Sequence, residues 1–241
     1  MFADWPDARD QAHPCRPTVS CTADIVAPGL LEVEAGALYS SVASGAAHVL
    51  SFPLLLKQTF TPLVQLQVGS NGYTLVDAAP SIRYFDNVYF GPKLHFLDQG
   101  DWSPSLALSA QLSLPTFAAT GYSRADDVFV TGYASKDIGF VHVDWNVGVL
   151  FWHVDASTST QVFTALALSP SLPAPFGAAV EGYWFSDASP VVPRDGGVRV
   201  AGNVSARSWL VFDLGGDVGF FPSTRAYSLF AGLTMIPVAF R

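Results

Sequence analysis

A strict alternation of apolar and polar residues recurs along most of this chain. In VHVDWNVGVLF, residues 141–151, the odd positions carry Val, Trp and Phe, and the first even positions are His142, Asp144 and Asn146. Successive side chains of a β-strand point to opposite faces, so this segment predicts a strand with one apolar and one polar face. In a water-soluble sheet the apolar face would form the core. In a membrane barrel it would meet lipid, and the polar face would line the lumen.

The alternation returns in about twelve segments, an even number of the kind that bacterial single-chain barrels contain. Each has roughly 10–15 residues, enough to cross a bilayer when the strand is tilted. Turns rich in Gly and Pro separate them. The predicted strands are residues 30–42, 47–60, 63–75, 83–97, 103–116, 126–137, 140–153, 159–169, 176–187, 197–207, 209–221 and 227–240.

The composition narrows the environment of these strands. Charged residues make up 13% of the chain, against about 25% in ordinary soluble domains. Hydrophobic residues make up 50%, and the mean hydropathy is +0.32. The sequence nevertheless contains no run of about 18 or more apolar residues that would form a transmembrane helix. A large soluble β-core and a β-barrel in lipid are the two folds that remain.

Three features favour lipid over a soluble sandwich. The polar faces carry mainly Ser, Gly, Ala, Asn and Gln, which suits an enclosed lumen, and lysine occurs only at Lys57, Lys93 and Lys136. Aromatic residues gather near segment ends, as in the interfacial girdles of membrane barrels. We therefore expect an all-β fold: a transmembrane, antiparallel, closed β-barrel over residues 30–241, with its first and last strands paired.

Residues 1–29 are polar, rich in Pro and Asp, and without period, so we expect an irregular periplasmic N-terminal arm. Within it, PCRPTVSCT carries Cys15 and Cys21. Their spacing permits a small disulfide loop, suited to an oxidising compartment, and free thiols are the alternative. The arm is a candidate plug for the barrel. Because MFADWPDARD has no apolar signal segment, we expect an export signal to have been removed or to lie upstream.

The polar faces supply a set of candidate lumen residues. Two interpretations stay open: the charges pair and fill the interior, as buried charges require, or they line a conduit that selects solutes. On the predicted strands 197–207 and 209–221, Arg207 is expected near Asp213. The candidate lumen and solute-path residues are Glu32, Glu34, Lys57, Lys93, His95, His142, Asp144, Asn146, Glu181, Arg199, Arg207, Asp213 and Asp217.

Enzymatic and nucleic-acid functions find little support. His142 and Asp144 share a face, as two metal ligands or the base and acid of a hydrolase would, but no third partner is fixed. GxSxG, HExxH and phosphate-loop motifs are missing. We expect no catalytic residue, no metal and no cofactor.

The net charge is −8 and the basic residues are scattered, which argues against nucleic-acid binding. The expected partners are membrane lipid and a small solute; the sequence does not indicate an oligomeric state.

Three stretches carry a family resemblance: FPLLLKQTFTPLVQLQVGSNGYT, DNVYFGPKLHFLDQGDWSPSLALSAQLSLPT and SWLVFDLGGDVGFFPSTRAYSLFAGLTM. Over roughly residues 25–240 the chain resembles outer-membrane barrels of the phenol-degradation MetA-pathway type. The resemblance implies a Gram-negative outer membrane and uptake of small compounds, aromatic ones included. The sequence departs from the usual pattern of outer-membrane chains because Arg241 follows the terminal aromatic residue Phe240.

These observations predict an outer-membrane transporter or channel for passive passage of a small, aromatic or hydrophobic solute, narrowed by residues 1–29 or an extracellular loop. A structural or interaction barrel with a filled lumen is the second hypothesis. An outer-membrane lipid hydrolase using His142 is the third.

Overall fold

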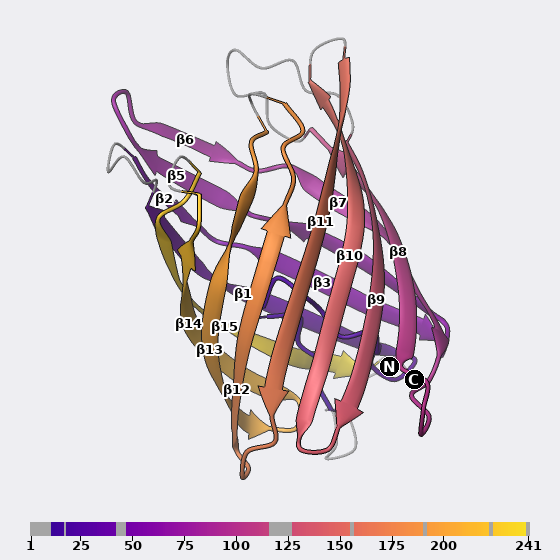
Figure 1. Ribbon diagram of the computed structural model, residues 1–241. Coiled ribbons are helices and arrows are strands. Elements are labelled where there is room, and N and C mark those ends of the chain that lie inside the picture. Colours follow the sequence, from indigo (N-terminus) through magenta and orange to yellow (C-terminus); the bar gives the residue numbers. More distant parts are fainter. Residues whose placement is uncertain are drawn as a thin grey trace.

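The alternating segments form the wall of one closed antiparallel barrel (Figure 1). This computed structural model describes residues 11–16, 18–41, 47–115, 127–154, 157–189, 192–221 and 224–239. Residues 1–10 of the expected arm and the connection at 117–126 lie outside this range. In the described part of the chain, no helix has the length and apolar character needed to cross a membrane.

In the described ranges, fifteen strands occupy twelve positions in the barrel wall. Their bounds agree with the predicted segments to within a few residues, except that three segments are each divided in two. The strands are β1 Leu30–Ser41, β2 His48–Ser51, β3 Leu54–Thr61, β4 Val64–Ser70, β5 Tyr73–Asp77, β6 Ile82–Phe85, β7 Val88–Leu97, β8 Ser105–Leu114, β9 Asp127–Ile138, β10 Val141–Val154, β11 Ser157–Pro170, β12 Phe176–Phe185, β13 Asp195–Arg207, β14 Leu210–Gly219 and β15 Tyr227–Ala239.

Pairing of β1 with β15 closes the barrel and confirms the predicted contact between the first and last strands. The register runs from Leu30 opposite Ala239 to Ser41 opposite Tyr227, with an irregularity between Leu31 and Val33. Every other neighbouring pair in the wall is also antiparallel. Closure pairs the edges of β1 and β15 with each other, as a hydrocarbon environment that cannot hydrogen-bond to backbone groups requires.

The three divided segments lie next to one another. The breaks fall at residues 52–53, 71–72 and 86–87, so β2, β5 and β6 continue the wall above β3, β4 and β7. Pro53 has no N–H to donate to a ladder. Gly72 adopts φ 68°, where a Cβ would lie 2.1 Å from the Phe52 carbonyl oxygen. Pro53 and Gly72 therefore account for the breaks at residues 52–53 and 71–72, which lie side by side in neighbouring strands.

The barrel is apolar outside and polar inside. Outward residues such as Leu214 (68% exposed), Val200 (58%) and Trp145 (51%) present large apolar side chains, as the alternation predicts. The buried inward side chains are mainly Ser, Thr, Gln and charged residues, among them Glu32, Lys57 and Glu181. A soluble sheet would show the opposite distribution, because its buried face is the apolar one.

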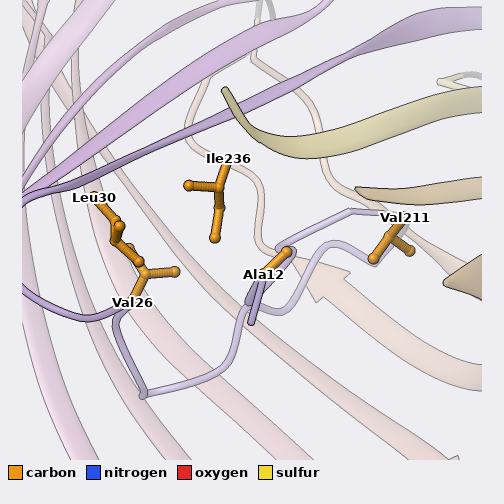
Figure 2. Packing of buried hydrophobic residues seen from close by; sticks show 5 residues of the cluster. All are labelled: Ala12, Val26, Leu30, Val211 and Ile236. Carbon is orange, nitrogen blue, oxygen red and sulfur yellow. The ribbon is translucent and has the colours of Figure 1, made fainter. Parts of the chain in front are cut away.

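Residues 11–29, which we call the arm, lie inside the barrel (Figure 1). A small apolar cluster fixes the two ends of this segment: Ala12 and Val26 pack with Leu30, Val211 and Ile236 (Figure 2). The backbone N–H of Ala12 also donates to the Ser208 carbonyl oxygen at 2.9 Å. Both ends of the arm are therefore held at the end of the barrel where β13 turns into β14.

Candidate functional site

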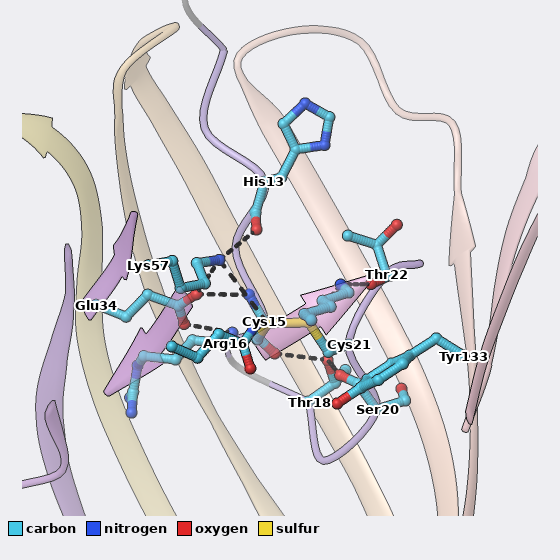
Figure 3. Close-up of a disulfide and its surroundings, with 12 residues drawn as sticks. His13, Cys15, Arg16, Thr18, Ser20, Cys21, Thr22, Glu34, Lys57 and Tyr133 are labelled. Atoms are coloured by element: carbon cyan, nitrogen blue, oxygen red, sulfur yellow. Dashed lines mark hydrogen bonds and ion pairs between the residues drawn. A yellow bond between two sulfur atoms is a disulfide. The ribbon is translucent and has the colours of Figure 1, made fainter. Parts of the chain in front are cut away.

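The candidate site is the polar inner wall together with the arm that occupies it. Cys15 and Cys21 are joined by a disulfide, so residues 15–21 form a closed ring. Two wall carboxylates bind this ring through its backbone. Glu34 on β1 accepts the N–H groups of Cys15 and Arg16, both at 2.9 Å (Figure 3). Glu181 on β12 accepts those of Val19 and Ser20, at 2.7 and 2.6 Å.

Further polar groups on the wall continue this main-chain recognition. The side chain of Asn146 on β10 accepts the Cys21 N–H at 2.7 Å and donates to the Cys21 carbonyl oxygen at 2.9 Å. Ser135 on β9 accepts the Ala23 N–H at 2.7 Å. The wall therefore holds the ring from β1, β10 and β12, and holds Ala23 just after the ring from β9, mostly independently of the side chains that the arm carries.

Lys57 on β3 stands at the centre of a buried ionic group. Its Nζ lies 2.6 Å from a Glu34 oxygen and 3.0 Å from a Glu32 oxygen, and it donates to the His13 carbonyl oxygen at 2.7 Å. Glu32 in turn accepts the His13 N–H at 3.0 Å. Two acids and one base with shared hydrogen bonds satisfy the requirement that buried charges be paired.

The imidazole of His13 lies within this environment. Burial, reinforced by the ammonium group of Lys57, lowers the pKa of His13 from its ordinary value of 6.5, while the carboxylate of Asp24 acts in the opposite direction. Docking of the arm therefore favours the neutral form of the His13 imidazole.

Arg16 anchors the ring to β14, which lies two positions from β1 and two from β12 in the barrel wall. Its Nε and Nη2 donate to the two carboxylate oxygens of Asp213 on β14, at 3.3 and 3.2 Å. The side chain lies over Gly36 and Gly232, which face each other across the β1–β15 seam. A Cβ at either glycine would come within 2.6 Å of the guanidinium, so the two glycines leave the space that Arg16 fills.

A second ionic group lies farther along the lumen. Arg199 on β13 faces Asp217 on β14, and its Nη2 donates to a carboxylate oxygen at 2.7 Å. Arg225 pairs with Asp195 at 2.5 Å and lies 3.8 Å from Asp217. Both guanidinium groups lie over the ring of Tyr183, with centroid distances of 5.6 and 5.4 Å. Alternating positive and negative groups thus cover this part of the wall.

The cluster around His142 does not form a catalytic arrangement. The two ring nitrogens of His142 lie 2.7 Å from Asp137 and 3.2 Å from Asp144. The hydroxyl of Ser135 donates to Asp144 at 2.5 Å rather than to His142. A hydrolase needs its nucleophile next to its base, and here a carboxylate lies between them. No group of three His, Cys, Asp or Glu side chains in the described residues is arranged to hold a metal.

Most of the sequence-predicted lumen residues are buried inside the barrel. Arg207 is an exception: it is exposed, lies opposite Leu210, and donates to the Ala206 carbonyl oxygen. The expectation that it faces Asp213 is therefore wrong. A bulge between Ser205 and Arg207 shifts the register, and Asn203 is the residue opposite Asp213. His142 and Asp144 are only partly buried, and the buried members are Glu32, Glu34, Lys57, Lys93, His95, Asn146, Glu181, Arg199, Asp213 and Asp217.

Sequence reasoning missed three residues of the site: Arg16, Arg225 and Ser135. Arg16 and Arg225 lie outside the alternating strands, so the period of two gave no facing assignment for them. The signal for Ser135 was present, because it shares a face with Thr131 and Tyr133 on β9, but serine is too common on polar faces to stand out.

Small cavities lie along the arm. One of about 120 Å³ lies between the ring and β3, lined in part by Cys15, Glu34 and Tyr89. Another of about 80 Å³ lies between Arg16 and Arg199. A third, of about 420 Å³, lies near His13, Asp24 and His95. His95 itself is held by Asp98, with 2.8 Å between Nε2 and the carboxylate oxygen. The two cavities beside the ring, of about 120 and 80 Å³, are thus smaller than the one near His13.

No family model and no curated protein matches this sequence. Solved structures match its fold. An outer-membrane channel from Pseudomonas putida F1 aligns with TM-score 0.66 at 11% identity, over 96% of this chain and 99% of that one. The transport unit of the autotransporter AIDA-I from Escherichia coli aligns with TM-score 0.50 at 10% identity, over 86% of this chain and 89% of that one.

These similarities, together with the topology, establish the fold class: a closed, antiparallel, twelve-position β-barrel of the kind seen in outer-membrane channels. Inside this barrel, a disulfide-closed ring is seated on the polar wall.

Proposed function

We propose that this protein is an outer-membrane channel of a Gram-negative cell that lets a small solute pass without chemical change, and that the arm narrows its lumen. The apolar outer face, the closed wall and the fold shared with a solved outer-membrane channel support this location. A small aromatic or hydrophobic solute agrees with the family resemblance. The carboxylate between Ser135 and His142 argues against the hydrolase alternative.

The observation that carries the proposal is the position of the ring in the lumen. Wall strands β1, β10 and β12 hold its backbone, and the cavities beside it measure about 80 and 120 Å³. A solute too large for these cavities would pass the ring only when the arm moves. Conduction in this proposal therefore depends on how firmly the arm is docked.

A filled barrel that serves as a scaffold is the second candidate. The dense hydrogen bonding of the arm favours it, because fully satisfied buried polar networks rigidify a structure. The two functions differ in one measurable property. A gated channel gains conductance when the arm is loosened, whereas a scaffold barrel loses only stability.

The test uses two substitutions at one arm position of the full-length chain. Ser20→Pro removes the N–H that donates to Glu181, whereas Ser20→Ala keeps it and removes a hydroxyl that has no hydrogen-bond partner among the described residues. We expect single-channel recordings in planar bilayers to show a higher conductance or open probability for Ser20→Pro than for the wild type. Ser20→Ala should resemble the wild type. Equal conductance of all three proteins, with a lower unfolding temperature for Ser20→Pro, would instead favour the scaffold.

A further inference from the structure

Each sulfur of the Cys15–Cys21 disulfide lies near a lysine side chain of the wall. Nζ of Lys57 is 3.8 Å from Sγ of Cys15, and Nζ of Lys93 is 3.9 Å from Sγ of Cys21. The two lysines differ in their surroundings. Lys57 is paired with Glu32 and Glu34, whereas Lys93, in the part of the chain that the structure describes, forms no ion pair and donates to the carbonyl oxygens of Thr22 and Asp24.

An ammonium group next to a cysteine sulfur stabilises the thiolate over the thiol. Even at the dielectric constant of bulk water, opposite unit charges about 4 Å apart attract by roughly 1 kcal/mol, equivalent to about fivefold in an equilibrium constant. The sulfur of Cys21 lies against a lysine without a neutralising carboxylate at ion-pair distance. With its amine protonated, Lys93 therefore favours the reduced form of the cysteine pair.

We propose that Cys15 and Cys21 form a thiol–disulfide exchange site for a small dithiol, and that reduction at this site loosens the arm. The second part rests on the proposed function of the arm, whereas the exchange chemistry does not. The chain contains two cysteines in all, so any thiol chemistry of this protein takes place at this pair.

The cavity of about 120 Å³ borders Cys15 and not Cys21, so Sγ of Cys15 is the sulfur that the dithiol attacks. It is lined by Cys15, with Pro53, Leu55 and Tyr89 on its wall side. A thiolate of the dithiol attacks Sγ of Cys15, the S–S bond breaks, and its electron pair leaves on Sγ of Cys21 beside Lys93. A mixed disulfide with Cys15 remains. The second thiol of the dithiol resolves it, so the dithiol becomes a disulfide and Cys15 a thiol.

The electrons and protons balance in this exchange. The dithiol loses two electrons and two protons, and the cysteine pair gains the two electrons. One proton stays on Cys15, and the other enters the solvent while Cys21 remains a thiolate. A leaving thiol of lowered pKa departs faster, so Lys93 favours this direction of attack as well as the reduced product.

Opening the ring changes how the arm binds to the wall. The closed ring holds five N–H groups in positions that fit Glu34, Glu181 and Asn146 at the same time. Without the disulfide, the undocked segment has more conformations to lose on docking. The entropy of closing so short a loop corresponds to a docking equilibrium weaker by roughly ten- to fiftyfold.

The first part of the experiment measures the chemistry alone. The detergent-solubilised, full-length protein is equilibrated with mixtures of reduced and oxidised dithiothreitol, and its thiols are counted by alkylation and mass spectrometry. We expect Lys93→Gln, which keeps an N–H donor, to need about a fivefold higher ratio of reduced to oxidised dithiothreitol at the midpoint than the wild type. Lys93→Arg, which keeps the charge, should return toward the wild-type midpoint.

The direction in which the dithiothreitol midpoint shifts distinguishes loss of the Lys93 charge from disorder of the arm. If Lys93→Gln merely disordered the arm, the disulfide would become more accessible and easier to reduce. Equal midpoints for wild type and Lys93→Gln, or an easier reduction of the variant, would overturn the exchange site.

The second part records single channels in the same dithiothreitol mixtures. Conductance of the wild type should rise at the ratio at which its thiols appear, and the Cys15→Ser/Cys21→Ser double variant should show a raised conductance that reductant does not change. If thiols form without any change in conductance while Ser20→Pro does raise conductance, the claim that reduction loosens the arm is overturned, whereas the proposed channel function stands. If no variant conducts, the proposed function and the loosening of the arm both fail, and the dithiothreitol midpoints still test the exchange chemistry.

Discussion

The guanidinium of Arg16 and the carboxylate of Asp213 form an ion pair, with 3.2 Å between Nη2 and Oδ1, although 197 positions separate them in the sequence. Asp213 is nearly inaccessible to solvent, and Arg16 reaches it from the arm across the glycine-lined seam of the barrel. The pair is the charged link between the arm and the side of the lumen formed by β14. It therefore offers a direct measure of how the arm and the wall stabilise each other.

A double-mutant cycle on this pair tests that link. Removing either partner leaves a poorly solvated charge, so we expect Arg16→Ala and Asp213→Ala each to lower the unfolding temperature in detergent. The coupling energy of the double variant should lie within about 0.5–3 kcal/mol, the usual range for residues in direct contact. Arg207 supplies the control because it is exposed and lies opposite Leu210. A cycle of Arg207→Ala with Asp213→Ala should show additive effects, and equal coupling in both cycles would refute the contact.

Substitution of Leu214 tests which face meets lipid. Its side chain is 68% exposed on the outer face of β14. In a bilayer, Leu214→Arg should destabilise the barrel by roughly 2–4 kcal/mol near the membrane centre, because the charge loses its hydration. Leu214→Ala is the matched control, and it should cost much less. Folding measurements into lipid vesicles provide the comparison, and an unaltered stability of Leu214→Arg would exclude a lipid-facing position.

Asn146→Ala should loosen the arm more than the wall. The substitution leaves the N–H and carbonyl group of Cys21 without their partners inside the lumen. Stranded buried groups cost about 1–3 kcal/mol each, so amide hydrogen exchange in residues 18–24 should accelerate by at least tenfold. Val147→Ala, on the neighbouring outward position, is the control and should leave these amides protected. Faster exchange throughout β10 in Asn146→Ala would show that the side chain supports the wall instead.

Acidification should release the arm through His13. Its pKa in the docked arm lies below 6.5, because of burial first and of Lys57 second, so the undocked arm binds the proton more tightly. The contribution of neutral His13 to docking is complete above pH 6.5 and is lost as the pH falls through the lowered pKa. Lys57, Lys93 and His142 oppose the protonated imidazole, and Asp24 favours it.

Single-channel conductance or arm exchange measured between pH 7 and pH 5.5 checks this expectation. The wild type should show increasing release toward the acidic end of this window. His13→Gln cannot titrate there, and its release should stay constant over the same window. If the two proteins respond to pH alike, the wall carboxylates rather than His13 control the response.

The strands and their facing were largely predictable from the sequence. A side-chain period of two places alternate residues on opposite faces, so Val200 and Leu214 were assigned outward and Glu181 and Asp213 inward without knowledge of the fold. The same regularity gave the number of wall segments and, with the requirement for closure, the pairing of the first and last strands. It did not give the breaks at residues 52–53, 71–72 and 86–87. The first two coincide with Pro53, which lacks an N–H, and with Gly72, which has a positive φ.

The alternation pattern was thus enough to assign the polar and apolar faces of the barrel, because facing is a local property of extended backbone. Which charges meet depends instead on the three-dimensional arrangement of the strands and the arm. The register of β13 and β14 places Asn203 opposite Asp213 and leaves Arg207 beside the turn, and the path of the arm brings Arg16 to Asp213 instead. Likewise, nothing in PCRPTVSCT indicates that its N–H groups fit Glu34 and Glu181, which lie on β1 and β12. These contacts join segments far apart in the chain, and their geometry arises from register and closure, which no local pattern encodes.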